Sequence, residues 1–144
     1  MTPEDGFRLA NLLALAGWLA LIAGIVLRRD ALRVSVAWRI VPVMLAVAYL
    51  ALLVGAPREG TGGGFGTLAA VAALFESRWA LLAGWIHYLC FDLMVGCWIA
   101  AEVLRRGMPR WVLVPALPLT FLLGPLGLVV FWGGVAFCRL RRSA

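Results

Sequence analysis

Four apolar runs constrain the fold of this chain more than any other feature of its sequence. They cover residues 7–27, 34–54, 79–104 and 111–137. Each run exceeds the roughly 20 residues that an α-helix needs to cross a hydrocarbon core of about 30 Å. None alternates between polar and apolar residues as membrane-spanning strands do. We therefore predict an all-α integral membrane protein with a single domain, residues 1–144, folded as a four-transmembrane-helix bundle.

The charged residues support this fold class. They make up only 14% of the chain, whereas a soluble domain carries roughly 25%. All thirteen basic residues are arginines, and most flank the apolar runs, as is usual in membrane proteins. Because a nucleic-acid site would need one basic patch, we expect the lipid bilayer as a partner and no nucleic acid. The amino terminus, MTPEDGFR, is acidic where a signal peptide would be basic, so we expect the first run to be retained.

The segments between the runs differ in composition. Residues 28–33 and 105–110 are short and basic, whereas residues 55–66 form a Gly-rich loop that we expect to be a flexible linker. This loop is not a phosphate-binding loop, because no Lys follows its glycines. Residues 67–77 are apolar but too short to span a membrane. They are expected to form an interfacial helix, a re-entrant turn or an extension of the third helix.

The arginines leave the orientation of a four-helix bundle open. The positive-inside rule compares the basic residues on the two sides of the membrane. In a four-helix topology the two sides carry equal numbers: Arg28, Arg29, Arg33, Arg105, Arg106 and Arg110 on one, and Arg8, Arg58, Arg78, Arg139, Arg141 and Arg142 on the other.

Asp92 lies near the middle of the third run, and so near the centre of the bilayer. An aspartate there costs about 2.5–3.5 kcal/mol on insertion scales, so it should face the bundle interior. Helical spacing places Gly84, Tyr88 and Gly96 on the same side. The glycines would let a helix or a flat ligand come close, and Tyr88 could donate a hydrogen bond to Asp92. A carboxyl in apolar surroundings can hold a proton, which suits a general acid or proton carrier; the alternative is a residue that holds helices together.

His87 is the only histidine in the chain, and it lies about 140° round the helix from Asp92. The two would share a pocket only if the third helix were enclosed on several sides. A catalytic role and an interhelical hydrogen bond are both open for His87. Haem would need a second axial ligand and zinc further ligands, and the three cysteines lack metal-site spacing. We therefore expect no metal and no cofactor other than a bound lipid-like ligand.

The fourth run is rich in Gly and Pro, and we predict a kinked helix there. Pro118 and Pro125 each remove a backbone hydrogen bond, and Gly124 thins the helix beside the second proline. The freed carbonyls need donors inside a membrane, which Thr120, water or a ligand hydroxyl could supply. Thr120, Gly124 and Pro125 are therefore candidate ligand-binding residues, and a kinked helix that only packs is the alternative.

We make structural or ligand-binding predictions for three other side chains within the apolar runs. Arg39 and Glu102 lie about one turn from the basic segments. They could form a structural ion pair between the second and third helices, or Arg39 could extend outward to the headgroups. Trp85 lies deeper than the tryptophans at the run ends, so it is a candidate to stack on a polyene or else fills the bundle core.

Two segments of the chain carry a family resemblance. One reads Trp-x-His-Tyr-x-x-x-Asp-Leu, from Trp85 to Leu93, with Trp98 following. The other reads Thr-Phe-x-x-Gly-Pro-x-Gly-Leu, from Thr120 to Leu128. Together they resemble the abscisic-acid-deficient-four-like (neoxanthin-synthase-like) family, small four-helix membrane proteins of bacteria and plants. Spacing and helix order extend the likeness over roughly residues 7–137.

The resemblance implies carotenoid chemistry. The plant chloroplast member is required for neoxanthin formation, in which a 5,6-epoxide of violaxanthin opens into an allene without net redox change. Such an isomerisation needs an acid at the epoxide oxygen and a base at a nearby C–H, and Asp92, Tyr88 and His87 are the candidates here.

The implied ligand is a carotenoid or related isoprenoid lipid, which the protein would bind or isomerise in an intramembrane pocket around the third helix. The implied location is a bacterial inner membrane or a photosynthetic membrane. The alternative function is a non-catalytic accessory subunit of a larger membrane complex, for example a photosynthetic one, with membrane-protein partners.

Overall fold

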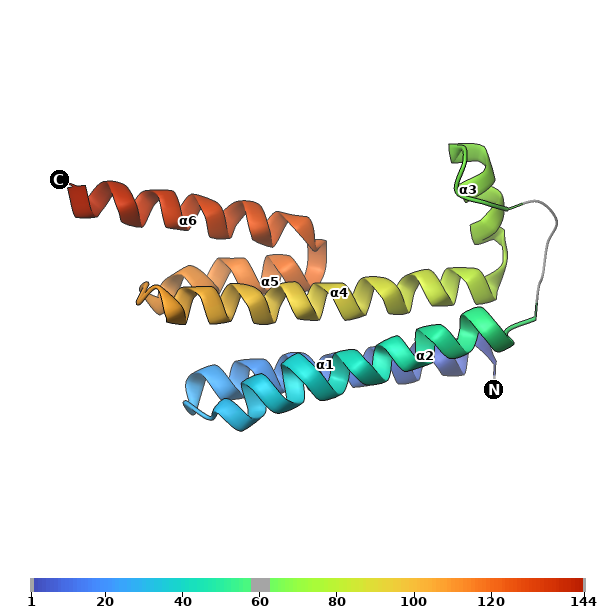
Figure 1. Cartoon of the computed structure of the whole chain (residues 1–144), viewed down its shortest axis with the longest axis horizontal. Coiled ribbons are helices and arrows are strands. Elements are labelled where there is room, and N and C mark those ends of the chain that lie inside the picture. Colours follow the sequence, from blue (N-terminus) through green and yellow to red (C-terminus); the bar gives the residue numbers. More distant parts are fainter. Residues whose placement is uncertain (1, 58–62, 144) are drawn as a thin grey trace.

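The computed structural model describes residues 2–57 and 63–143, and these are helical apart from short connections (Figure 1). The described residues contain no strand, so the all-α fold is confirmed. In chain order the helices are α1 (Pro3–Val26), the π-helix η1 (Ala31–Ile40), α2 (Val41–Gly55), α3 (Leu68–Glu76), α4 (Arg78–Arg105), the 3-10 helix η2 (Arg110–Val112), α5 (Leu113–Leu123) and α6 (Pro125–Ser143).

Three helices in the described residues are long and apolar enough to cross a membrane. They are α1, α4 and the continuous helix that η1 and α2 form together, and they correspond to the first three predicted runs. Thr2 caps α1, because its hydroxyl accepts a hydrogen bond from the Asp5 N–H at 3.2 Å. Pro3 then occupies the first turn, where its missing N–H removes no helical hydrogen bond.

Glycine brings α1 close to both other long helices. A Cβ at Gly17 would lie 2.5 Å from Cδ2 of Leu93 in α4 and 2.9 Å from Cγ1 of Val41 in α2. Leu21, Leu45 and Leu93 are fully buried around this contact. The core therefore lies where α1, α2 and α4 meet, and it holds the middle of α4 in place.

Residues 67–77 form a separate short helix. The Thr67 hydroxyl caps α3 by accepting from the Ala70 N–H at 3.1 Å, and Ser77 separates α3 from α4. In Figure 1, α3 projects away from the end of the bundle at which α4 begins. The segment is therefore not an extension of the third helix. Residues 58–62 of the predicted linker 55–66 lie outside the described residues.

The fourth run is two helices rather than the predicted single kinked helix over 111–137. Gly124 has a φ of 51°, which residues with a side chain rarely adopt, so α5 ends there. Pro125 has no N–H with which to continue α5, yet its fixed φ suits the first position of a new helix. The four-transmembrane-helix bundle is therefore not confirmed in its last helix.

Helices α5 and α6 form an antiparallel hairpin. Close to the turn, a Cβ at Gly127 of α6 would overlap the Thr120 side chain of α5. Further from the turn, the rings of Trp111 and Phe137 lie 6.2 Å apart. Residues progressively earlier than the turn thus contact residues progressively later than it, so α6 runs back alongside α5 (Figure 1).

The hairpin reaches only about halfway along α4. Helix α5 has 11 residues, a length of about 16 Å against a hydrocarbon core of about 30 Å. Its turn lies beside the middle of α4, since a Cβ at Gly124 would be 2.8 Å from Oδ1 of Asp92. In a membrane, a hairpin of this depth would be re-entrant, entering and leaving on one side.

The return of α6 gives the bundle one strongly basic end. At this end lie the connection after α1, the connection after α4 and the end of α6 (Figure 1). Among the described residues, Arg8 and Arg78 lie at the opposite end. The basic end carries Arg28, Arg29, Arg33, Arg105, Arg106, Arg110, Arg139, Arg141 and Arg142. The basic residues, balanced in a four-helix topology, are thus unequal between the two ends, and by the positive-inside rule we expect the basic end on the cytoplasmic side.

This topology predicts that the two termini lie on opposite sides of the membrane. A reporter that fluoresces only in the cytoplasm should be active at the carboxyl terminus and inactive at the amino terminus when the protein is made in a bacterium. A reporter active only outside the cytoplasm should give the reverse pattern. Four full crossings would put both termini on one side, so equal reporter signals at the two ends would contradict the re-entrant hairpin.

Candidate functional site

Asp92 lies at the middle of α4, against the turn of the re-entrant hairpin. Its side chain is buried, with 9% exposure, and Oδ1 lies 2.8 Å from the Cβ position at Gly124. Only a residue without a side chain leaves room for the carboxyl there. Oδ2 is buried and accepts no hydrogen bond from any of the described residues. Buried polar atoms are normally hydrogen-bonded, so this oxygen is a candidate to bind a ligand.

Tyr88 stands one helical turn before Asp92 on the same side of α4. Its hydroxyl donates to the carbonyl of Leu122, near the end of α5, at 3.4 Å. A bond of 3.4 Å is long for an O–H donor, so the hydroxyl can turn toward Asp92 or toward a bound group. Tyr88 and Asp92 thus lie one turn apart on α4, and the Tyr88 hydroxyl binds the hairpin turn that packs against Asp92.

The helix break at Gly124 lies beside this pair. The first N–H groups of a helix have no partner within the helix, and its amino terminus carries a partial positive charge. Helix α6 begins at Pro125, directly after the Gly124 turn that faces Asp92. Interrupted helices whose ends meet near the bilayer midplane are how many membrane proteins build ligand sites.

Thr120 packs within the hairpin and not against Asp92. Its side chain is fully buried, and its hydroxyl donates to the carbonyl of Ala116 at 2.8 Å. A Cβ at Gly127 would overlap that hydroxyl. Thr120 therefore satisfies a carbonyl one turn back and packs against α6, so its position supports the turn at Gly124.

Trp85 extends the site along α4 toward the amino end. Its ring stacks on that of Tyr88, with centroids 5.3 Å apart. Its indole N–H donates to Oδ1 of Asn11 in α1 at 3.2 Å, and the Asn11 amide donates to the carbonyl of Phe7 at 2.8 Å. Asn11 was not among the predicted residues, although the sequence contains a signal for it: it is the only asparagine, and it lies inside an apolar run.

A cavity of about 240 Å³ lies beyond Trp85. Trp85, Phe7 and Leu81 line it, and the ion pair of Arg78 with Glu4 lies at its outer end. Asp92, Tyr88, Trp85 and this cavity thus follow one another along the first half of α4.

Aromatic side chains from other helices fill the space beside the two glycines that were predicted to let a ligand or a helix come close. A Cβ at Gly96 would overlap the Trp18 ring of α1, and a Cβ at Gly84 would lie 2.7 Å from the Phe75 ring of α3. Both glycines therefore serve close packing between helices. They mark the two ends of the strip that contains Tyr88 and Asp92.

His87 lies on a different face of α4 from Asp92. Its side chain is exposed, and its ring is 4.6 Å from that of Phe91 and 5.7 Å from that of Tyr49 in α2. The structure therefore does not bring His87 to Asp92. Among the described residues, no three His, Cys, Asp or Glu side chains are grouped so as to hold a metal ion.

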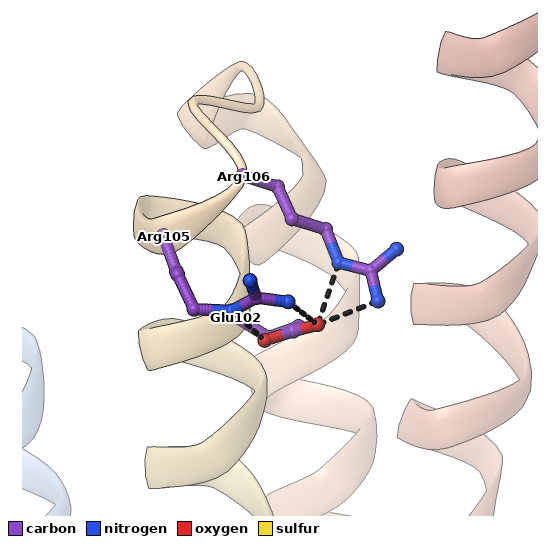
Figure 2. Close-up of polar contacts among 3 residues, drawn as sticks. All are labelled: Glu102, Arg105 and Arg106. Atoms are coloured by element: carbon purple, nitrogen blue, oxygen red, sulfur yellow. Dashed lines mark hydrogen bonds and ion pairs between the residues drawn. The ribbon is translucent and has the colours of Figure 1, made fainter.

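The predicted ion pair between Arg39 and Glu102 is not formed. Glu102 instead pairs with Arg105 and Arg106 at the end of α4, with N–O distances of 2.7 and 2.5 Å (Figure 2). Arg39 lies on the exposed side of η1. Glu102 forms these pairs because arginines three and four residues further along the chain reach a helical carboxylate without leaving the helix.

The family comparison agrees with the sequence segments around this site. A family model described as ABA DEFICIENT 4-like matches residues 6–131. The match spans Asp92, Tyr88 and the hairpin turn at Gly124. Comparison with curated proteins and with solved structures gives no match.

Proposed function

The chain belongs to the ABA DEFICIENT 4-like family, and from this premise we propose that it binds a carotenoid or related isoprenoid lipid beside Asp92 and isomerises it. One observation carries the proposal. The Asp92 carboxyl is buried at the middle of a membrane-length helix, and its Oδ2 has no hydrogen-bond partner among the described residues. A carboxyl that only held helices together would be expected to accept a hydrogen bond from a neighbouring helix.

The site has the groups that an epoxide isomerisation requires. An acid gives a proton to the epoxide oxygen as the C–O bond breaks, and a base removes a proton from the adjacent C–H, so the product is an isomer of the substrate. Asp92 and Tyr88 can divide these tasks, because both contact the hairpin turn and each can hold or release a proton. No oxidant or reductant is needed.

The surroundings of Asp92 suit a rod-shaped apolar ligand. Leu122 and Phe121, at the hairpin turn, are 65% and 41% exposed, so the turn borders the lipid. A ligand dissolved in the bilayer can therefore approach from the side. With an oxygen at Asp92, its polyene would lie over the stacked rings of Tyr88 and Trp85 and continue toward the cavity beyond.

Replacing Tyr88 by Phe tests the acid–base assignment. In membranes that contain an epoxy-carotenoid, the Tyr88→Phe protein should form the isomeric product about 100-fold more slowly, the lower end of the contribution of a positioned acid or base. Product formation is followed by chromatography and mass spectrometry.

Tyr49→Phe is the matched control, since Tyr49 is the only other tyrosine and packs on His87. It should turn over substrate as the wild type does. Equal rates in all three proteins would show that the Tyr88 hydroxyl has no part in the reaction.

A further inference from the structure

A second cavity lies at the basic end of the bundle, between η1 and α4. It has a volume of about 420 Å³. Arg33 and Trp38 of η1 form one wall, and Trp98 and Arg105 of α4 form the other, with Cys97 and Ala101 also lining it. None of these residues belongs to the site around Asp92.

The π-helix explains how two of these side chains share a wall. Its hydrogen bonds run from one residue to the fifth before it, as the Val41 N–H to the Val36 carbonyl illustrates. Residues five apart are therefore close to one another along the helix surface. Arg33 and Trp38 are five apart, and in an α-helix they would instead point about 140° apart. The unusual helix thus aligns a cation with an aromatic ring.

In each wall the arginine lies nearer the end of the bundle than the tryptophan. Arg105 follows Trp98 by seven residues, which is two helical turns and about 10 Å along α4. Both arginines therefore lie at the outer end of the cavity, and both tryptophans lie deeper. Trp98 is fixed from behind by α6, because its ring lies 5.3 Å from that of Phe131.

The arginines keep hydrogen-bond donors for an anion. Arg105 uses its Nε and Nη2 groups on Glu102 (Figure 2), whereas a guanidinium has five N–H donors. Glu102 also pairs with Arg106. One negative charge thus faces two positive charges, and the group of three keeps a net charge of +1. Arg33 pairs with Asp30 through Nη2 alone. The neighbouring Arg28, Arg29 and Arg110 increase the positive potential at this end.

We propose that this cavity binds one anionic phospholipid. Its phosphate lies at the outer end, with Arg33 and Arg105, and the start of an acyl chain lies against Trp38 and Trp98. Charge complementarity identifies this occupant, since basic pockets between membrane helices on the cytoplasmic side attract anionic headgroups. The order of cation outside and aromatic inside matches a lipid with its head at the interface. This site is independent of the isomerisation proposed above.

Native mass spectrometry of the full-length protein in mild detergent tests the proposal. Phosphatidylglycerol and phosphatidylcholine with the same acyl chains are titrated separately. The wild type should bind one phosphatidylglycerol more tightly than phosphatidylcholine. The double variant Arg33→Gln with Arg105→Gln should bind phosphatidylglycerol about 30-fold more weakly, given the contribution of each arginine near an anionic headgroup.

The double variant Arg28→Gln with Arg29→Gln is the matched control, because it removes the same charge at the same end but outside the cavity. It should keep most of the preference for phosphatidylglycerol. Trp38→Leu, which keeps both arginines, should also weaken binding of this lipid. Equal binding of the two lipids, equal losses in the two double variants, or displacement of the lipid by an equal concentration of inorganic phosphate would each overturn the proposal.

Discussion

Asp92→Asn is expected to lower the rate of isomerisation by about two to four orders of magnitude, the contribution of a positioned acid or base. Asparagine has nearly the same shape as aspartate, so it fits beside the Gly124 turn, but it cannot give or take a proton. The fold should be retained, since the change removes an ionisable group from an apolar surrounding. Turnover of an epoxy-carotenoid and the thermal unfolding temperature are measured on the same preparation.

Asp30→Asn is the control for this change, because Asp30 pairs with Arg33 at the basic end, whereas Asp92 lies at the middle of α4. It should leave the rate of isomerisation unaltered. If Asp92→Asn turned over substrate at the wild-type rate, the carboxyl would have no chemical role. If it failed to fold, the function of Asp92 would be to hold the helices together.

Gly127→Ala is expected to open the α5–α6 hairpin and thereby remove the turn from Asp92. The new Cβ would lie 2.7 Å from the backbone N of Thr120 and 2.7 Å from the carbonyl oxygen of Ala116, and neither backbone atom can move aside without moving α5. Forcing an extra methyl into such a contact costs about 1–3 kcal/mol. Both the thermal unfolding temperature and ligand binding should fall.

Gly133→Ala is the matched control in the same helix, because a Cβ at Gly133 meets nothing within 4 Å. Alanine there should maintain or slightly raise stability, since alanine favours a helix over glycine. Equal unfolding temperatures for the two variants would contradict the packing of α6 on α5.

The three long helices could be predicted from the sequence because hydrophobic length determines them almost alone. The predicted run 79–104 differs from α4 by one residue at each end. That Tyr88 and Asp92 share one side of α4 was also predictable, since residues four apart share a helix face. These features depend on the spacing of residues along one helix and on the cost of exposing a carboxyl to lipid, and both can be judged from the sequence alone.

The hairpin turn was not predictable on the same grounds. A Gly-Pro pair within an apolar run is compatible with a kinked helix and with a chain reversal between two helices. Which of the two forms depends on what packs against the residues after the proline. Here Gly127 lies against α5 and Gly134 against Val112, just before it, and Phe131 is fully buried beside Trp98 of α4. This tertiary packing makes the return favourable, and no local pattern in the sequence describes it.

The roles of Asn11 and Glu102 depend on contacts that spacing along one helix did not identify correctly. Asn11 holds Trp85 from a helix 74 residues away in sequence. Glu102 was predicted to pair across helices with Arg39, but both of its partners, Arg105 and Arg106, follow it directly at the end of α4. The side chains that position the site are thus harder to predict than the residues at its centre.

Mass spectrometry of lipids extracted from the gently purified protein tests the central claim most directly. The wild type should retain an oxygenated isoprenoid, such as a carotenoid, in a fixed ratio to protein, and Asp92→Asn prepared in parallel should retain much less. Gly133→Ala should retain as much as the wild type. If no isoprenoid accompanied the wild type, and a fixed set of other membrane proteins did, isoprenoid binding at Asp92 would be contradicted in favour of an accessory subunit.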